Sequence, residues 1–327
     1  MHMSDTLISP PVFIATSVIA AGLIFVATRR IGQPRADEQL DQTTSAERRR
    51  RLVPLMGVMG ALIFAAQMLN FTIPATGSSG HIVGGVLLAA VLGPWAGFLT
   101  LTSILVVQCL LFADGGLMTL GCNVLNMAAL SCLVAYPLVF KPLVRNSNST
   151  ARWATASIAT SIVALAMGAL AVTIETELSG ITALPYGRFL AFMLPIHLLI
   201  GLGEGLATAA VIATLRRYRP ELLIDSTQSS ARSRTPFLAI TAVVALLVAT
   251  VAGAVASSHP DGLEWSIERT TQGTEIANAP STLHQSADQI QTTTALMPDY
   301  EASMAGLVGV GATLVVIYGA SLLIRRR

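Results

Sequence analysis

The first two residues of the chain, together with a distant histidine, have the atoms needed to chelate a metal ion. Met1 supplies a free amine, and His2 supplies a backbone amide and an imidazole ring. The amine and the amide nitrogen close a five-membered ring, and the amide nitrogen and Nδ1 close a six-membered ring. With His81 as a candidate fourth ligand, these planar nitrogens suit Ni(II) or Cu(II) and can be imposed on Co(II). Because the nitrogens must lose protons to bind, we expect metal affinity to depend on pH.

Three further polar residues are candidates for supporting this centre. Asn123 and Asn126 lie three apart on one helix face, where they either orient the metal-binding histidines or bond across helices. Asp5 is expected to fix the amino-terminal segment, and direct metal ligation is the weaker alternative. The bulky His2 side chain is expected to protect Met1 from removal, so that the chelating amine is retained.

Two ionisable residues share a single apolar stretch. His197 and Glu204 are seven residues apart, which places them two helical turns apart on roughly one face. Ionisable groups inside a membrane are costly and mark functional positions by default. The pair either lines the path by which the metal leaves or holds the helices together through hydrogen bonds.

The composition is that of a polytopic membrane protein. Of 327 residues, 53% are hydrophobic and only 12% are charged, and the net charge of +2 gives no strong field for nucleic acid. The odd number of cysteines (Cys109, Cys122 and Cys132) and the lack of a CxxC pair argue against a disulfide framework or a thiolate metal site. Lys141 is the single lysine and follows Phe140, which excludes a GxxxxGK[ST] phosphate-binding loop. Energy for uphill transport must therefore come from a partner or an ion gradient.

Apolar stretches and basic clusters predict an all-α membrane protein of nine spans. Basic loops stay cytoplasmic, so Arg29, Arg30, Arg35 and the run 48–51 place the amino terminus outside and the carboxy terminus inside. The stretch 82–92 is short for a span, so either it is partly re-entrant or the preceding loop dips into the membrane. The predicted spans are 11–28, 52–70, 82–92, 95–112, 117–140, 153–174, 189–215, 237–256 and 304–324.

The chain is expected to fold as two membrane units. Residues 1–217 form a seven-helix unit, 218–235 a cytoplasmic linker, and 236–327 a two-helix unit with an acidic outer segment at 257–303. That segment either raises the local concentration of divalent cations or is a solvated spacer. In the second span Gly57, Ala61 and Ala65 form a ridge of small residues that lets another helix approach closely.

Six segments occur in an order that resembles a known family. They are Met1-His2 with Asp5, Thr76-Gly77-Ser78-Ser79-Gly80-His81 with Gly84-Gly85, Ala113-Asp114-Gly115-Gly116-Leu117, Gly121-Cys122-Asn123-Val124-Leu125-Asn126-Met127, His197-Leu198-Leu199-Ile200-Gly201-Leu202-Gly203-Glu204-Gly205 and Pro260-Asp261-Gly262-Leu263-Glu264. The first five, from Met1 to about Arg217, resemble the substrate-capture subunit of cobalt/nickel energy-coupling-factor (ECF) transporters. The sixth resembles the small two-helix accessory subunit of such systems, of the PDGLE type, fused in frame.

The resemblance implies a fold, a cargo and partners. The fold is a helical bundle in the cell membrane whose extra first helix drives the amino terminus into the substrate pocket. Met1, His2 and His81 match the ligands of the transported Ni²⁺ or Co²⁺, and no organic cofactor is implied. The subunit is not an enzyme. A transmembrane coupling subunit, which the small-residue ridge would face, and two cytoplasmic ATP-binding subunits would power import. The chain departs from the family pattern at Met3-Ser4 and Thr6, which puts the loop beside the chelate in doubt.

Two other functions stay open on the sequence alone. A self-sufficient secondary metal transporter would need its own proton or ion relay, for which His197 and Glu204 are the one candidate pair. An intramembrane enzyme would need an HExxH pair, which is absent, or a Ser/His dyad, which one sequence does not exclude. Nickel and cobalt also stay open. Planar nitrogen ligands and the PDGLE-type segment favour nickel.

Overall fold

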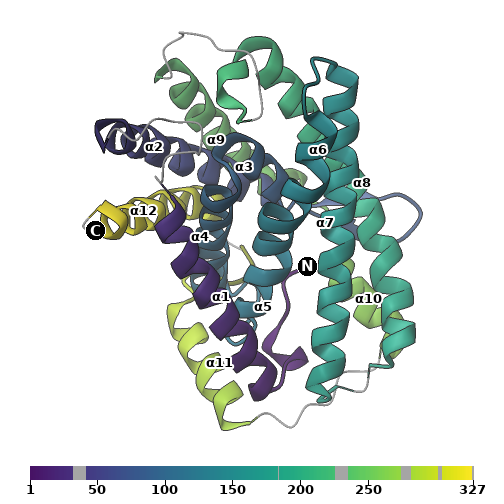
Figure 1. Ribbon diagram of the computed structural model, residues 1–327. Coiled ribbons are helices and arrows are strands. Elements are labelled where there is room, and N and C mark those ends of the chain that lie inside the picture. The colour runs from purple at the N-terminus through teal and green to yellow at the C-terminus, as the bar shows by residue number, and fades with distance from the viewer. Residues whose placement is uncertain (32–41, 183, 225–234, 274–280, 301–303, 326–327) are drawn as a thin grey trace.

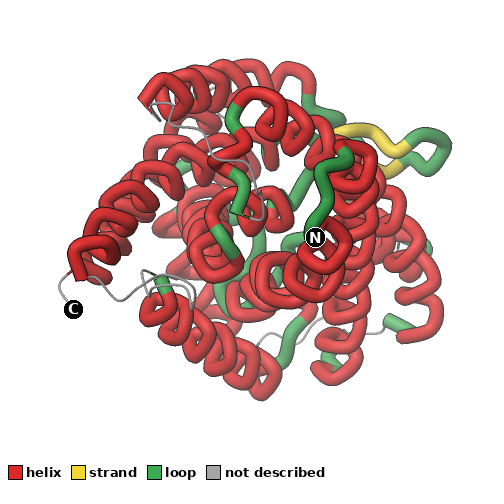
Figure 2. The backbone as a smooth tube through the Cα atoms, turned by 45° about the horizontal axis from the view of Figure 1, so that its top comes forward, coloured by secondary structure: helices red, strands yellow, loops and turns green. Residues whose placement is uncertain are grey.

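The computed structural model describes residues 1–31, 42–182, 184–224, 235–273, 281–300 and 304–325 and is mostly helical (Figures 1 and 2). The elements in order are η1 (Asp5–Leu7), α1 (Pro10–Arg30), α2 (Gln42–Gln67), β1 (Phe71–Ile73), β2 (Ser78–Gly80), α3 (Gly85–Leu92), α4 (Pro94–Phe112), α5 (Leu120–Asn123), η2 (Val124–Phe140), α6 (Lys141–Val144), α7 (Thr150–Ser179), α8 (Tyr186–Tyr218), η3 (Pro220–Leu222), α9 (Thr235–Val255), α10 (Gly262–Thr271), α11 (Thr282–Thr294), η4 (Pro298–Tyr300) and α12 (Ala305–Arg325).

Five helical segments in the described residues are long and apolar enough to cross a membrane. They are Pro10–Arg30, Pro94–Phe112, Leu120–Val144, Thr150–Ser179 and Tyr186–Tyr218. The apolar parts of α2, α9 and α12 are shorter, at Leu52–Gln67, Pro236–Val251 and Ala305–Ala320. The helical class is therefore confirmed, whereas the count of nine spans and the sidedness of the two termini stay predictions.

The boundaries of the second predicted span and its loop differ from the structure. Helix α2 begins at Gln42, within the stretch that the sequence assigns to a basic loop, and it continues through Pro54. Two predicted features lie outside the described residues. One is Arg35 of the first basic loop, and the other is the stretch 225–234, which is most of the predicted linker.

A short hairpin precedes the predicted third span, and within that stretch the structure has a short buried helix. Strands β1 and β2 pair antiparallel, with Phe71 opposite Gly80, around a turn in which Ala75 and Gly77 have positive φ. Helix α3 then has only eight residues, all of them buried. Eight residues rise about 12 Å, far less than the apolar thickness of a bilayer. Residues 82–92 thus form an internal element and hold the end of the hairpin inside the bundle.

Helices α7 and α8 pack closely along a line of small residues. A Cβ built on Gly201 would lie 2.8 Å from the Ile162 Cα, and one on Gly205 would lie 2.6 Å from the Ile158 Cα. Such backbone contact is how helices associate where no hydrophobic effect drives them together. The close packing fixes the inward face of α8, which carries His197 and Glu204, both 1% exposed.

The ridge of small residues predicted to face a coupling subunit is instead buried inside this chain. Helix α2 packs against α9 and α12, which form a group with it in Figure 1. A Cβ on Gly57 would lie 3.2 Å from Leu314 Cδ2 of α12, and Ala61 and Ala65 are at most 2% exposed. The small residues do serve close helix approach, but the approaching helices belong to the accessory unit of the same chain.

The polar segment between α9 and α12 folds back onto the bundle. Helix α10 lies along α8, and α11 lies beside α1 and α4 (Figure 1). The Ser79 N–H donates to the Pro260 carbonyl over 2.8 Å, and the Ser257 N–H donates to the Asn70 carbonyl over 2.8 Å. The alternative of a solvated spacer is therefore wrong for the described part of this segment.

Candidate metal centre

The amino-terminal segment runs into the middle of the bundle rather than out to solvent. Figure 1 shows the N-terminus among α5, α7 and α10. Met1 is 5% exposed, and Met3 and Ile8 are fully buried. A Cβ on Gly168 of α7 would lie 2.8 Å from Met1 Cε, so the lack of a side chain there makes room for Met1. The first residue is thus held in place by apolar packing around its side chain.

The Met1 amine forms an ion pair with a residue of the accessory unit. Its nitrogen lies 2.7 Å from Asp261 Oδ2. The other oxygen, Oδ1, accepts from the Leu263 and Glu264 N–H groups, each over 2.8 Å, and so caps the start of α10. Burial favours the neutral acid, but the positive amine and the Glu264 N–H outweigh it and hold the pKa of Asp261 well below its usual range. Asp261 is therefore a charged partner of the amine.

The His2 imidazole is held by a second carboxylate. Its Nδ1 lies 3.0 Å from Asp114 Oδ1, and the Tyr300 hydroxyl donates to Asp114 Oδ2 over 2.7 Å. Burial opposes ionisation, but His2 and Tyr300 outweigh it and hold the pKa of Asp114 well below its usual range. Because a carboxylate only accepts, His2 Nδ1 carries a proton in this arrangement. His2 Nε2 is buried without a hydrogen-bond partner among the described residues.

His81 lies directly beside His2. The two rings stack with centroids 5.3 Å apart and an angle of 16° between their planes. His81 Nδ1 lies 3.2 Å from the Ile82 carbonyl, which only accepts, so the neutral ring keeps its lone pair on Nε2. Burial, the positive amino terminus and His2 lower the pKa of His81 to about 4. His81 is therefore neutral at pH 7 and presents the form of imidazole that binds metals.

Asp5, which was predicted to fix the amino-terminal segment, and Asn123, which was predicted to orient the histidines or bond across helices, both bind to this part of the fold. Asn123 Oδ1 accepts from the Met3 N–H over 2.9 Å, and the Gly116 N–H donates to the Met3 carbonyl over 2.8 Å. Asp5 Oδ1 accepts from the Thr119 N–H over 3.0 Å. These bonds tie both sides of Met3 and the first turn after it to the start of α5. Asp5 acts on the backbone here and makes no contact with the two histidines.

Asn126 and Glu204 both form hydrogen bonds in the interior of the bundle. The Asn126 amide donates to Glu175 Oε2 over 2.7 Å and does not contact either histidine of the centre. The Glu204 carboxylate accepts from the Val83 N–H over 2.7 Å and from the Gly84 N–H over 3.1 Å. Glu204 thus anchors the backbone that directly follows His81. It is a positioning residue, and the structure does not pair it with His197.

His197 faces the same centre from α8. Its Nδ1 lies 2.8 Å from the Met193 carbonyl, and its Nε2 is buried without a hydrogen-bond partner among the described residues. With Met1, His81 and Asp261 it lines a small internal cavity of about 10 Å³. That volume is close to the space of one water molecule or ion.

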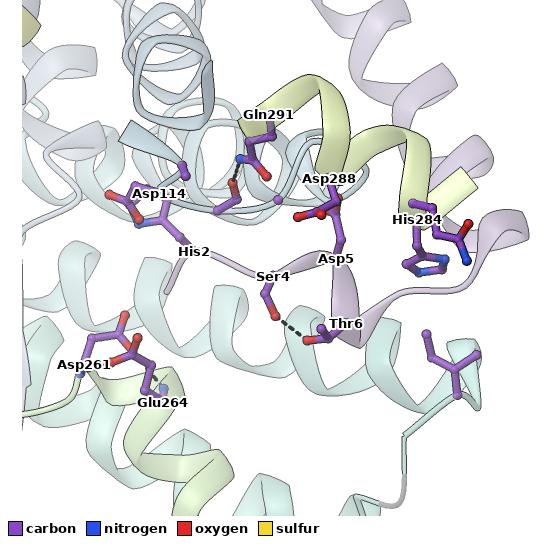
Figure 3. Close-up of a pocket in the computed structure, with 15 residues that line it drawn as sticks. His2, Ser4, Asp5, Thr6, Asp114, Asp261, Glu264, His284, Asp288 and Gln291 are labelled. Carbon is purple, nitrogen blue, oxygen red and sulfur yellow. Dashed lines mark hydrogen bonds and ion pairs between the residues drawn. The ribbon is translucent and has the colours of Figure 1, made fainter. Parts of the chain in front are cut away.

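A larger acidic cavity opens beside the two carboxylates. It has a volume of about 590 Å³. Figure 3 shows His2 and Asp114 on one side of the amino-terminal segment, with Asp261 and Glu264 of the accessory unit facing them. Its walls carry five carboxylates and neither lysine nor arginine, the acidic residues being Asp5, Asp114, Asp261, Glu264 and Asp288. Such a cavity concentrates cations next to His2.

Side chains alone do not complete a metal centre here. Among the described residues, no group of three His, Cys, Asp or Glu side chains converges as a metal site would require. A site at this place needs the nitrogens of the amino terminus in addition to the imidazoles. The free thiols of Cys109, Cys122 and Cys132 are all buried, and none lines either cavity.

Three residues that hold the candidate centre could not be singled out from the sequence. Asp114 is predicted only as part of the segment 113–117 of the family resemblance, Asp261 only as part of the PDGLE-type motif, and Tyr300 not at all. The Asp-Gly-Leu-Glu pattern at 261–264 does predict a capping box, and that signal was available. That the cap also reaches the Met1 amine depends on docking of the accessory unit, which no local pattern encodes.

Comparison with known proteins shows the family to which the chain is similar. Residues 2–222 match the family described as "Cobalt uptake substrate-specific transmembrane region" (CbiM), and residues 235–326 match the PDGLE domain. A putative fused nickel transport protein NikMN of Archaeoglobus fulgidus is 38% identical over 219 residues, which cover 65% of this chain and 70% of that protein. A probable fused nickel transport protein LarMN of Lactiplantibacillus plantarum is 30% identical over 287 residues, 83% of this chain and 80% of the relative.

The fold is also similar to solved structures. One described as a transition metal transporter is 28% identical, with a TM-score of 0.53, over 66% of this chain and 93% of that one. Among the sequence relatives, a cobalt transport protein CbiM of Sorangium cellulosum is 35% identical over 184 residues, which cover 52% of this chain and 76% of that protein. The chain therefore belongs to the CbiM family of cobalt uptake transmembrane proteins, as a membrane-bound cobalt/nickel transport component fused to a PDGLE domain.

Proposed function

We propose that this chain is the metal-capture subunit of an ATP-driven importer for Ni²⁺ or Co²⁺ in the cell membrane. The ligands are the Met1 amine, the His2 amide nitrogen and Nδ1, and His81 Nε2. One observation carries the proposal. A chain terminus, which is normally in solvent, is buried beside two stacked imidazoles. Burying an amine is costly, and a use that needs the free amine accounts for that cost.

Capture of the ion would be an exchange of partners. In the structure Asp261 binds the amine and Asp114 binds His2 Nδ1, so both donors are held by carboxylates. An incoming divalent cation would take over both donors. The ammonium group and the His2 amide would each release a proton to solvent, and the proton on His2 Nδ1 would leave as well, so that a neutral ring keeps its proton on Nε2. The carboxylates keep the two donors close together beforehand, which reduces the entropy lost on binding.

The acidic cavity is the proposed inlet for the ion. Its wall carries five carboxylates, and two of them, Asp114 and Asp261, also bind the proposed metal donors. Fixed negative charge in a concave, partly buried wall raises the local concentration of cations and their association rate. The accessory unit contributes Asp261, Glu264 and Asp288 to this wall, which gives it a role in loading rather than in catalysis.

Energy and release would come from partners. The single lysine of the sequence excludes a phosphate-binding loop in this chain. A transmembrane coupling subunit and two cytoplasmic ATP-binding subunits, as in ECF transporters, would reorient the capture subunit and release the ion inward. Planar nitrogen ligation favours nickel over cobalt as the preferred cargo.

The test compares three forms of the full chain by isothermal titration with Ni²⁺ and Co²⁺. One carries a single extra residue before Met1, one carries a tag after Arg327, and one has its extension removed to restore Met1. Extension converts the amine into an amide and should lower affinity by at least about a hundredfold, whereas the other two forms should bind tightly. Equal affinity in all three forms would exclude the amine as a ligand.

A further inference from the structure

The His197 ring has one nitrogen in use and one that is not. Its Nδ1 lies 2.8 Å from the Met193 carbonyl, and a carbonyl only accepts, so Nδ1 carries the ring proton. The neutral ring then has its lone pair on Nε2, which has no partner among the described residues although the side chain is 1% exposed. A histidine that donates from one nitrogen to a backbone carbonyl and presents the other is oriented as metal-ligating histidines are.

The His197 ring lies beside the candidate metal centre. His197 lines one small cavity with Met1, His81, Asp261 and Gly262. Gly262 lies against the unpartnered nitrogen, because a Cβ built there would be 3.3 Å from His197 Nε2 and 3.1 Å from Cε1. The accessory unit therefore covers this nitrogen with a residue that has no side chain. Movement of that glycine would open the nitrogen to the cavity.

We propose that His197 Nε2 is a transfer ligand, which takes the metal ion from the amino-terminal chelate on its way into the bundle. This inference rests on the proposed function. A divalent ion that leaves the chelate enters an apolar bundle, where loss of ligands is very costly. A preoriented imidazole beside the chelate lets one nitrogen replace another, so the ion is never without protein ligands. Glu204, with both oxygens bound to backbone, is not available for this role.

The experiment uses the purified full chain with His197→Asn, because the asparagine amide can keep the bond to the Met193 carbonyl while the Nε2 position is lost. The substitution is made with the native amino end and with a one-residue extension that removes the chelate. Co²⁺ is the probe, followed by its visible spectrum and by pulsed electron paramagnetic resonance, which detects imidazole nitrogens. The matched control is His259→Asn, the same substitution at an exposed histidine that does not line the small cavity.

The extended chain should bind Co²⁺ weakly, with imidazole coupling, and His197→Asn should weaken that binding by at least about tenfold. With the native end, where all four nitrogen ligands are present, the same substitution should change the affinity of the purified chain for Co²⁺ by less than about threefold. In cells that produce this variant, Co²⁺ uptake should be slower by at least about tenfold. His259→Asn should change none of these. Retained affinity at the native end also shows that the variant folds.

Three results would overturn the transfer role. They are residual binding that does not respond to His197→Asn, the absence of any Co²⁺ binding by the extended chain at millimolar concentration, and an equal loss of affinity in both backgrounds. Failure of the proposed function has a different signature. In that case the extension itself leaves Co²⁺ affinity unchanged before any substitution at His197.

Discussion

The Met1 amine and the Asp261 carboxylate are 260 positions apart in the chain and 2.7 Å apart in space. One atom of this pair is a proposed metal ligand, and the other belongs to the accessory unit. The amine is thus in contact with a competitor that the ion must displace. A partly buried charge-assisted hydrogen bond of this kind contributes about 1.5–3 kcal/mol.

Asp261→Asn should increase equilibrium affinity for Ni²⁺ by about three- to tenfold at pH 7, because the competing charge is removed while the amide oxygen still caps α10. Isothermal titration of the full chain measures this. Asp288→Asn is the control, since Asp288 lines the same acidic cavity but has no bond to the amine. A loss of affinity in Asp261→Asn would mean that holding the amine in place favours binding more than the competing charge opposes it, and would contradict the role of Asp261 as a net competitor.

Glu204→Gln should weaken the metal centre indirectly. In the glutamine amide only the oxygen accepts a hydrogen bond, so one of the Val83 and Gly84 N–H groups keeps its acceptor. The other N–H group then faces the NH₂ group, which is also a donor. We expect a loss of about 1–3 kcal/mol in stability and a lower Ni²⁺ affinity, because the backbone after His81 loosens. Thermal unfolding and titration are measured together. Glu264→Gln, which leaves this backbone untouched, should not lower stability by a comparable amount.

Gly262→Ala should disturb the docking of the accessory unit. The added methyl group would lie 2.7 Å from Ile200 Cδ1 and 3.1 Å from His197 Cε1. We expect destabilisation of about 1–3 kcal/mol from overpacking, together with slower Co²⁺ loading in stopped-flow absorbance. The control is Gly187→Ala on α8, another glycine inside a helix, where a Cβ meets nothing within 4 Å. Equal behaviour of the two variants would show that Gly262 is not closely packed in solution.

Stability of the metal-free chain should fall as pH is lowered from about 6.5 toward about 4. The pKa of His81 is about 4 in the folded state against 6.5 for the free side chain, so the unfolded chain takes up this proton first. Its contribution is fully present above pH 6.5 and is lost as the pH falls toward 4. Asp114 and Asp261, whose pKa values are lowered, add a further loss below their usual pKa of 3.8.

Thermal melts between pH 4 and pH 8 check this dependence. The loss between pH 6.5 and pH 4 should be smaller in His81→Gln than in the wild type, while His259→Gln, at an exposed histidine, should leave it in place. Identical pH dependence in the wild type and in His81→Gln would contradict the assignment of the shift to His81.

Local patterns in the sequence were sufficient for the long helices. The positions of α4, α7 and α8 follow from apolar runs bounded by charged or small residues, which act over a few turns. The nature of the third predicted span stayed open on the sequence, because hydropathy alone does not distinguish a fully buried α3 of eight residues from a short membrane segment. The outward-facing ridge was wrong for a related reason, since small residues predict close approach but not which helix approaches.

The centre was predictable only in part. Met1, His2 and His81 could be named as candidates because the ligand chemistry of their atoms does not depend on packing. The structure brings the three residues together, and their role as ligands stays a prediction. Asp114 and Asp261 could not be assigned, because their contacts with these residues exist only once the amino-terminal segment enters the bundle and α10 docks on α8. The sequence likewise could not assign different roles to His197 and Glu204. The structure distinguishes them, because His197 Nε2 has no hydrogen-bond partner among the described residues and the Glu204 carboxylate binds backbone N–H groups.

The packing of α9 and α12 on α2 also affects the occupancy of the contact between Asp261 and the Met1 amine. Because the accessory unit and the capture unit are one polypeptide, their docking is intramolecular, with an effective concentration on the order of millimolar or higher. Dilution in the membrane and unequal synthesis of two subunits therefore leave the occupancy of the Met1–Asp261 contact unchanged. The rate at which an ion gains the amine is then a property of each single molecule, independent of how many copies the membrane holds.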